Sequence, residues 1–226
     1  PRVFEGRGLN RRDGERLILW LAAGMILGAH LIHLIFYEPY SFIYNPERII
    51  EIGKGLASHG GGLGAILALA WYCRRYRLEF HRHADACMVG ALWVIPFVRI
   101  GNFFNSEIVG RPIDLPWAVV FVQRGDGIPR HPSQLYEALV GFAILAVGLW
   151  LNKKYAARLR TGSLLYLLLL LYFATRFLLE YVKEYQVLHP GFPLTMGQCL
   201  SLPIVLLCAY LLFFTKRFKL FPLVRE

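Results

Sequence analysis

The stretch SLLYLLLLLYFATRFLLEYV, Ser163–Val182, decides the fold class of this protein. Its length matches the roughly 20 apolar residues that cross the ~30 Å hydrocarbon core of a bilayer. Its charged residues lie in the second half, where Tyr172, Arg176 and Glu180 follow one another at intervals of four and therefore share one helix face. A charge inside a membrane span is costly unless it is paired or hydrated. The stretch therefore predicts a transmembrane helix with one functional polar face.

The rest of the sequence repeats this apolar pattern. Hydrophobic residues make up 56% of the 226 residues and charged residues 18%, a balance that soluble domains rarely reach. Five further blocks approach the length of a span: Leu17–Tyr37, His59–Cys73, Ala86–Phe104, Gln134–Leu151 and Leu194–Phe214. The sequence therefore predicts an all-α integral membrane protein, one domain over residues 1–226, with six transmembrane helices.

The net charge of +10 arises from Lys and Arg residues that gather in four places. They lie before the first block and after the second, fourth and sixth blocks. With six spans, all four places face one side, which the positive-inside rule makes cytoplasmic. The C-terminus is then cytoplasmic. Because the charge is spread over loops and forms no continuous face, nucleic acid is excluded as a partner and the lipid bilayer is expected.

Two long loops fall on the outer side of this topology. Glu38–Ser58 contains an amphipathic stretch, Pro46–Leu56, that is expected to lie along the membrane surface. Asn105–Ser133 contains Leu115–Phe121 and then the turn signal Gly125-Asp126-Gly127, which together predict a short strand or hairpin arm. Loops of this length usually carry function.

An arginine also interrupts the block Ala86–Phe104. Arg99 is followed closely by Asn102, Asn105 and Glu107. A charge, two amides and a carboxylate within nine residues favour a polar or anionic ligand at membrane depth.

Arg99 and Arg176 lie at matching depths, because each is thirteen residues past the first residue of its block. That distance corresponds to roughly 20 Å along a helix and places both toward the outer leaflet. The two guanidinium groups would repel each other unless an anion lies between them, or unless Glu107 and Glu180 neutralise them. Arginine suits phosphate, because its planar fork donates two parallel hydrogen bonds. The alternative is an Arg176–Glu180 ion pair that only locks two helices together.

His59 opens its block at the predicted outer side and is followed by Gly60-Gly61-Gly62-Leu63-Gly64. These glycines would let the backbone approach an anion at a helix N-terminus. They would equally allow two helices to pack closely. The His81–Asp85 segment has histidines but no further ligands, so no metal site is predicted.

Six motifs, in this order along the sequence, resemble those of the bacterial phosphatidylglycerol–prolipoprotein diacylglyceryl transferases. They are His59–Gly64, Arg99–Glu107 with Gly110–Pro112, Leu115–Phe121, Arg130–Glu137, Arg176–Glu180, and Met196–Gln198 with Ser201–Pro203. The resemblance implies transfer of a diacylglyceryl group from phosphatidylglycerol to the lipobox cysteine thiol of a preprolipoprotein, with release of glycerol phosphate. It implies no cofactor and no metal.

The resemblance also implies roles for individual residues. Arg99 would bind the phosphate, and Arg176 would be the second essential arginine. For the thiol proton, His59 is the natural candidate base, since an unperturbed imidazole has a pKa near 6.5; arginines near the thiol could instead lower the pKa of the thiol itself. Tyr172 and Glu180 complete the expected catalytic set. The expected substrate-binding set is Arg99, Asn102, Asn105, Glu107, Gly110, His131 and Gln134. The site would open toward the outer leaflet of the bacterial cytoplasmic (inner) membrane, on the periplasmic side.

The sequence departs from the family pattern in three places. The family usually has seven spans, so the resemblance implies that the first one is absent here. His30 stands where the family has an arginine, and Lys183 opens the run that is usually Arg-x-Pro-Asp. Two other functions stay open: a catalytically impaired lipid-binding homologue, and a membrane transporter or flippase. Transporters often carry inverted repeats and interrupted helix pairs, and the sequence shows neither.

Overall fold

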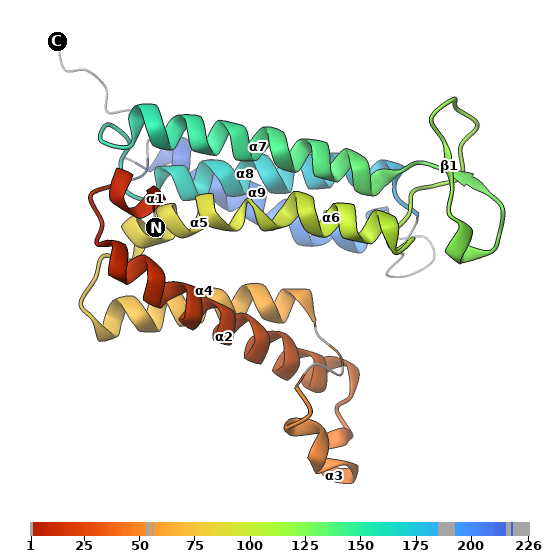
Figure 1. Cartoon of the computed structure of the whole chain (residues 1–226), viewed down its shortest axis with the longest axis horizontal. Helices are drawn as coiled ribbons and strands as arrows, with labels where there is room; N and C mark the ends of the chain where they lie inside the picture. Colours follow the sequence, from red (N-terminus) through yellow and green to blue (C-terminus); the bar gives the residue numbers. More distant parts are fainter. Residues whose placement is uncertain (1, 53–54, 56, 185–192, 216–217, 219–226) are drawn as a thin grey trace. The chain divides into compact units, whose positions relative to one another are not determined.

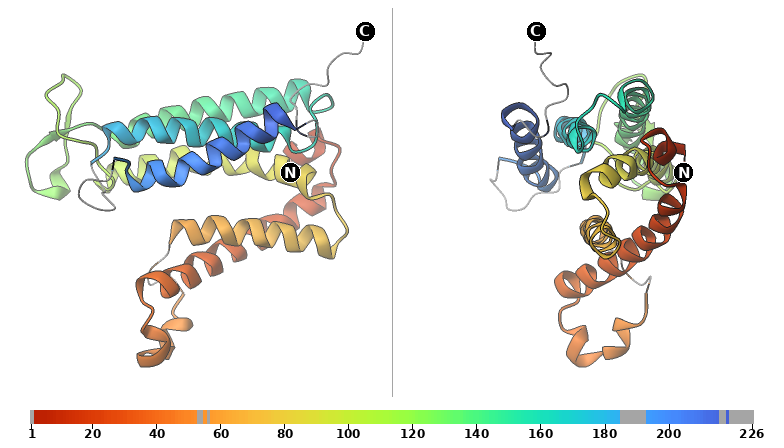
Figure 2. Two further views of the ribbon diagram at one scale, coloured as in Figure 1. Left: turned by 180° about the vertical axis from the view of Figure 1, so that it is seen from behind. Right: turned by 90° about the vertical axis from the view of Figure 1, so that its left-hand side faces the viewer.

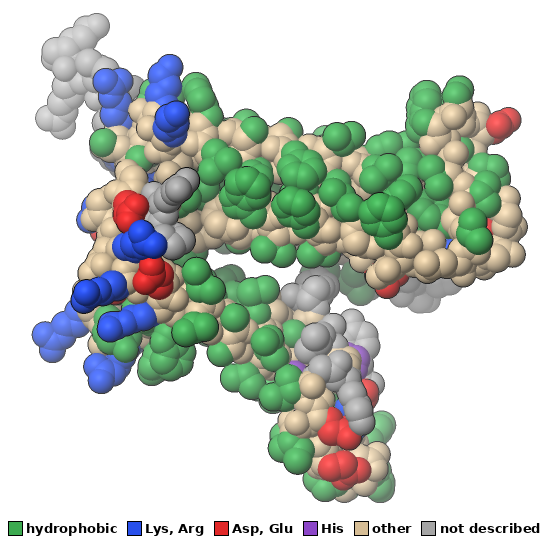
Figure 3. Space-filling view, viewed as in Figure 1, with side chains coloured by type: hydrophobic (Ala, Val, Ile, Leu, Met, Phe, Trp, Pro, Cys, Tyr) green, Lys and Arg blue, Asp and Glu red, His purple; other side chains and the backbone are tan. Residues whose placement is uncertain are grey.

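A computed structural model describes residues 2–52, 55, 57–184, 193–215 and 218 of the protein. The polypeptide divides into two compact units, Pro1–Ala84 and Asp85–Glu226. Both consist mostly of helices (Figure 1), and on the face drawn in Figure 3 exposed Lys and Arg side chains gather at one end of each unit while apolar side chains cover the length of the helices. This distribution is the one expected of helices that lie in lipid.

The first unit is a pair of antiparallel helices, α2 (Arg11–Tyr37) and α4 (Ser58–Arg75), preceded by the short α1 (Arg2–Gly6) (Figure 1). Glycines let the two helices touch backbone to backbone. A Cβ on Gly64 would overlap the carbonyl oxygen of Gly24, and one on Gly28 would overlap that of Gly60. The structure thus gives Gly60 and Gly64 the helix-packing use that the sequence had left open.

The loop between α2 and α4 contains α3 (Ser41–Tyr44) and η1 (Pro46–Ile49). Arg48 donates to both carboxylate oxygens of Glu38, at 2.8 and 2.9 Å, and thereby lowers the pKa of Glu38 to about 2. Buried His30 places Nε2 3.1 Å from the Ile49 carbonyl oxygen. Apolar side chains point outward: Tyr40, Ile43, Tyr44, Ile50 and Ile52. The loop's position on the membrane surface stays a prediction, and residues 53–54 and 56 of the amphipathic stretch lie outside the described residues.

The second unit contains α6 (Val94–Phe104), α7 (Ser133–Tyr155), α8 (Ser163–Leu179) with η3 (Glu180–Val182), and α9 (Met196–Phe214). Helices α7, α8 and α9 lie side by side in both views of Figure 2. The preceding helix, α5 (Phe80–Ala91), is separated from α6 by a break at Leu92–Trp93. Pro96 explains the break, because its ring displaces the carbonyl four residues earlier and it donates no backbone hydrogen bond.

The predicted hairpin arm is confirmed between α6 and α7. Strand β1 (Val119–Val120) pairs antiparallel with β2 (Pro129–Arg130), and η2 (Val122–Arg124) precedes the turn between them. Gly125 and Gly127 both have positive φ, 70° and 65°, a backbone conformation that glycine adopts without strain. Residues 105–132 are called the arm below.

Five described helices are long and apolar enough to cross a membrane: Arg11–Phe36, Phe80–Phe104, Ser133–Tyr155, Ser163–Val182 and Met196–Phe214. They confirm a mostly helical, multi-pass membrane protein. The remaining predicted block, His59–Cys73, forms α4, which is not among the five, because its eighteen residues include four glycines and two arginines. A count of six spans therefore stays a prediction.

The buried carboxylate of Asp85 caps α8 from outside the helix. Its Oδ2 accepts the Gly162 N–H at 2.9 Å, and its Oδ1 accepts the Leu165 N–H at 2.7 Å. Asp85→Ala would leave both amides without this acceptor, at about 1–3 kcal/mol each for a buried group. We expect the midpoint of thermal unfolding in detergent to fall by several degrees, whereas exposed Asp114→Ala should leave it unchanged. Equal midpoints for the two variants would contradict this role of Asp85.

Candidate functional site

Three cationic side chains from three parts of the second unit meet at one carboxylate, that of Glu137 on α7. Arg99 of α6 places Nε 3.0 Å from Oε2 of Glu137. On the other oxygen, Lys183 Nζ lies 2.7 Å and Arg176 Nη1 3.7 Å from Oε1. The Glu137 side chain is only 7% exposed. A buried carboxylate in this position holds Arg99, Arg176 and Lys183 close together in spite of their like charge.

A second carboxylate, Glu180, reaches the same cluster through Lys183, whose Nζ lies 3.6 Å from Oε2. Glu180 is buried, and a Cβ on Gly197 of α9 would overlap its carboxylate, so a glycine is required at that position. Counting formal charges, Arg99, Arg176 and Lys183 contribute +3, while Glu137 and Glu180 contribute −2. These five residues together keep one uncompensated positive charge. A largely buried site with that surplus favours a monoanion.

A hollow opens beside the cluster. Its volume, together with the open space at its mouth, is about 240 Å³. Arg99, Glu137 and Arg176 line it together with Tyr172, so the four-residue spacing of Tyr172 and Arg176 does bring both to one place. The remaining lining is Ile95, Val140, Thr175 and Leu179. Apolar walls with convergent charged groups are typical of a binding site for an amphipathic ligand.

A series of hydrogen bonds extends the cluster toward the arm. Arg99 Nη1 donates to Asn102 Oδ1 at 3.4 Å, and Asn102 Nδ2 donates to Glu107 Oε2 at 2.8 Å. Gln134 is fully buried, and its Nε2 donates to the backbone oxygen of Glu107 at 2.7 Å. The structure therefore brings together four of the predicted residues: Arg99, Asn102, Glu107 and Gln134.

The carboxylate that contacts both arginines is Glu137, which the sequence reasoning did not select. It had offered Glu107 and Glu180 as the neutralising groups. In the structure Glu107 reaches Arg99 through Asn102, and the ion pair of Glu180 is with Lys183. The signal available was position: Glu137 closes the Arg130–Glu137 motif and lies one turn after Gln134 on the same helix.

Gly110 lies where three backbone segments meet. Its N–H donates to the His131 carbonyl at 3.0 Å, and on the other side it forms a bridge with Lys183. A Cβ here would overlap the Cβ and carbonyl oxygen of His131. Glycine is thus required because the backbone of Gly110 approaches that of His131 closely, and this packing fixes the backbone at Lys183. Direct contact of Gly110 with a substrate stays a prediction.

His131 is held by two aromatic side chains. Its Nδ1 lies 3.1 Å from the Tyr136 hydroxyl, which accepts the indole N–H of Trp117 at 2.9 Å. Burial, and then the charge of Arg111, lower the pKa of His131 from its ordinary value. A neutral imidazole can accept a hydrogen bond at Nδ1. The Tyr136 hydroxyl can therefore accept from Trp117 and donate to His131.

One predicted site residue of the second unit, Asn105, takes part in none of the cluster's described contacts. Asn105 ends α6 as an exposed residue. His59 is the second residue of α4, in the first unit, and its side chain lies outside the described residues. The catalytic assignment of His59 therefore stays a prediction.

Comparison with known proteins agrees with the resemblance in the motifs. Residues 2–214 match the family described as prolipoprotein diacylglyceryl transferase. A relative named phosphatidylglycerol–prolipoprotein diacylglyceryl transferase, from Bacteroides fragilis, is 36% identical over 225 residues, which cover 93% of this chain and 81% of the relative. Proteins of the same name from Tolumonas auensis and Bordetella bronchiseptica are each 39% identical, covering 91% of this chain and 80% and 79% of their own lengths. The chain belongs to the prolipoprotein diacylglyceryl transferase family.

Proposed function

We propose that this protein transfers the diacylglyceryl group of phosphatidylglycerol to the lipobox cysteine thiol of a preprolipoprotein. The products are a thioether-linked lipoprotein precursor and glycerol phosphate, as in the first step of bacterial lipoprotein maturation. The observation that carries the proposal is the hollow lined by Arg99 and Arg176 and organised by Glu137.

Charge matching supports a phosphodiester as the ligand. The cluster has one uncompensated positive charge, and the phosphodiester of phosphatidylglycerol carries one negative charge. Two guanidinium groups can each donate in parallel to phosphate oxygens. The apolar part of the lining, Ile95, Val140 and Leu179, suits the start of the acyl chains.

The reaction is an alkyl transfer. The thiolate sulfur attacks the saturated CH₂ carbon of the diacylglyceryl group, the C–O bond to phosphate breaks, and its electron pair leaves on the phosphate oxygen. Arg99 and Arg176 stabilise the leaving phosphate in a site shielded from water. Holding the two reactants in line supplies the rest of the rate acceleration. In this scheme Tyr172 borders the reacting headgroup, and Glu180 joins Glu137 in holding the Lys183 ammonium in place.

The remaining assignments form the headgroup side of the site. We assign Asn102, Asn105, Glu107, Gly110, His131 and Gln134 to substrate binding, with no metal or organic cofactor. The protein would cross the cytoplasmic (inner) membrane six times, with its C-terminus in the cytoplasm. The arm and the α3 loop would then be periplasmic, and the hollow would face the outer leaflet. The clustering of Lys and Arg at one end of each unit supports this orientation.

We assign removal of the thiol proton to His59, since an unperturbed imidazole has a pKa near 6.5. His59→Gln is expected to lower the transfer rate at pH 7 by about 10²–10⁴-fold, the usual contribution of a general base. The measurement is the initial rate of thioether formation between pH 6 and 9, with His81→Gln as the matched control. An unchanged rate in the His59 variant would remove this assignment.

One assay separates the proposed function from its two alternatives. The purified protein is placed in phosphatidylglycerol vesicles with a lipobox peptide, and the peptide mass and released glycerol phosphate are measured. A diacylglyceryl mass increase on the cysteine supports the proposal. Lipid retained on the protein without product would indicate an impaired lipid-binding homologue. Movement of lipid between leaflets without product would indicate a transporter or flippase.

A further inference from the structure

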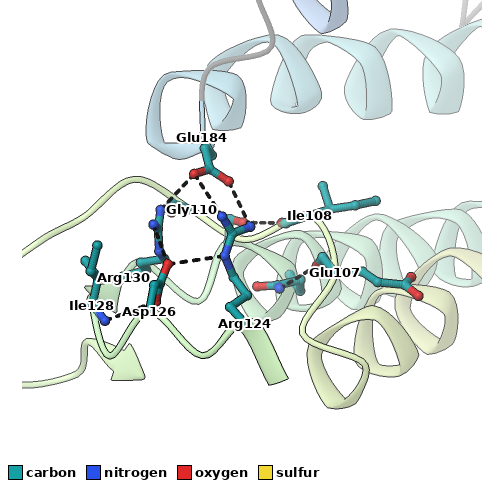
Figure 4. Close-up of polar contacts among 10 residues, drawn as sticks. Glu107, Ile108, Gly110, Arg124, Asp126, Ile128, Arg130 and Glu184 are labelled. Carbon is teal, nitrogen blue, oxygen red and sulfur yellow. Dashed lines mark hydrogen bonds and ion pairs between the residues drawn. The ribbon is translucent and has the colours of Figure 1, made fainter. Parts of the chain in front are cut away.

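Four charged side chains lock the arm to the segment that follows η3; we call them the arm clasp (Figure 4). Arg130 donates to Asp126 Oδ2 at 2.8 Å and to Glu184 Oε1 at 3.0 Å. Arg124 contacts both oxygens of Glu184, with Nη1 3.0 Å from Oε2 and Nη2 donating to Oε1 at 3.3 Å. Two arginines face two carboxylates, so the clasp has no surplus charge with which to bind an ion. Its chemistry is that of a structural link.

The two arginines of the clasp differ in burial. The Arg130 side chain is 6% exposed, whereas that of Arg124 is 34% exposed. Arg130 also lies near the junction of backbone segments, with Nη1 3.5 Å from the Gly110 carbonyl oxygen. The Ile128 N–H and then Arg130 lower the pKa of Asp126, which keeps this carboxylate charged at neutral pH. Arg130 is therefore the more buried arginine of the clasp, and it also contacts the backbone at Gly110.

The clasp and the cationic cluster are joined by two consecutive residues, Lys183 and Glu184. Lys183 has extended backbone angles, φ −80° and ψ 155°, and neighbouring side chains on an extended backbone point to opposite sides. Glu184 accordingly reaches the clasp, while Lys183 Nζ reaches Glu137 at 2.7 Å. Arg111 Nε adds a hydrogen bond to the Lys183 carbonyl at 2.9 Å.

We infer that Arg130 is a positioning residue of the transfer site: by holding Glu184 it fixes the backbone at Lys183, and so keeps the Lys183 ammonium at Glu137. Glu137 in turn places Arg99. Lysine has a long, flexible stem, so the position of its ammonium at Glu137 depends on where its backbone is held. The inference rests on the proposed function, because it concerns the geometry of the same site.

The test is a double-mutant cycle on the full-length protein in phosphatidylglycerol vesicles with a lipobox peptide. The variants are Arg130→Gln, Lys183→Gln and the pair together, with Arg124→Gln as the exposed control that shares the same carboxylates. We expect Arg130→Gln to lower kcat about 10- to 100-fold, since small misplacements of a catalytic group have effects of that size. Arg124→Gln should change kcat less than about threefold. When Lys183 is already Gln, Arg130→Gln should lower kcat by less than about a further threefold, because Arg130 acts on the site through Lys183.

Multiplicative effects of Arg130→Gln and Lys183→Gln would overturn the inference, since a general loss of structure would act independently of Lys183. Equal losses for the Arg130 and Arg124 variants would also overturn it. Should Arg130→Gln fail to fold, Glu184→Gln tests the same link and should show the same dependence on Lys183. An inactive wild-type protein would refute the proposed function. An active wild-type protein in which the effects of the Arg130 and Lys183 substitutions multiply would refute only the role of Arg130.

Discussion

Glu137→Gln is expected to abolish transfer and to destabilise the protein, a larger combined effect than that of any other single change at the cluster. The substitution keeps the size of the side chain but removes the charge that Arg99, Arg176 and Lys183 share. Removing one partner of a buried ion pair costs about 3–5 kcal/mol, because the remaining charges are left uncompensated. The transfer rate should fall by at least about 10²-fold, since misplaced groups lose positioning. The measurements are initial rates in vesicles and thermal unfolding in detergent.

Glu79→Gln provides the matched control, because that carboxylate is exposed and lies far along the sequence from the cluster. It should leave both the rate and the unfolding midpoint unchanged. A Glu137→Gln protein that keeps more than a third of wild-type activity would show that the cluster does not organise the reaction.

Arg99→Gln is expected to lower kcat/KM for phosphatidylglycerol by about 10²–10³-fold, the usual loss when one group that stabilises developing negative charge is removed. Arg99 connects Glu137 with the hydrogen bonds of Asn102 and Glu107. Arg99→Lys should recover little of this loss, because lysine keeps the charge but lacks the planar fork that serves two directions at once. Steady-state rates at varied mole fractions of phosphatidylglycerol give the measurement.

Arg158→Gln, at an exposed position after α7, serves as the control for a general loss of positive charge. It should match the wild type. If the transfer rate of Arg99→Gln is within threefold of this control, Arg99 has no role in binding the phosphate.

Much of the fold could be predicted because membrane helices are encoded locally. Ser163–Val182 and four other helices stand out by length and apolar composition alone. The break between α5 and α6 was not predicted, although Pro96 supplies its cause. The exception was α4, where glycines lower the hydropathy and two of them, Gly60 and Gly64, pack the helix against α2. The composition of a segment predicts its affinity for lipid, but it does not predict which helix the segment packs against.

The site was predictable where it depends on a single helix. The spacing of Tyr172 and Arg176 placed both on one face, and both line the hollow. Glu137 was not selected as a member of the cluster, because its role comes from contacts between α7, α6 and the segment after η3. Glu137 and Lys183 lie far apart in the sequence, and no local pattern records a contact of that kind.

The most direct measurement of the central claim uses phosphatidylglycerol labelled with ¹⁸O at the oxygen that bridges the diacylglyceryl carbon and phosphorus. The protein in vesicles of this lipid is given a lipobox peptide, and both products are analysed by mass spectrometry. The account predicts a diacylglyceryl thioether on the cysteine and ¹⁸O retained in glycerol phosphate, with both products lost in Arg99→Gln. An unmodified peptide, or ¹⁸O that leaves the phosphate, would contradict alkyl transfer at this site.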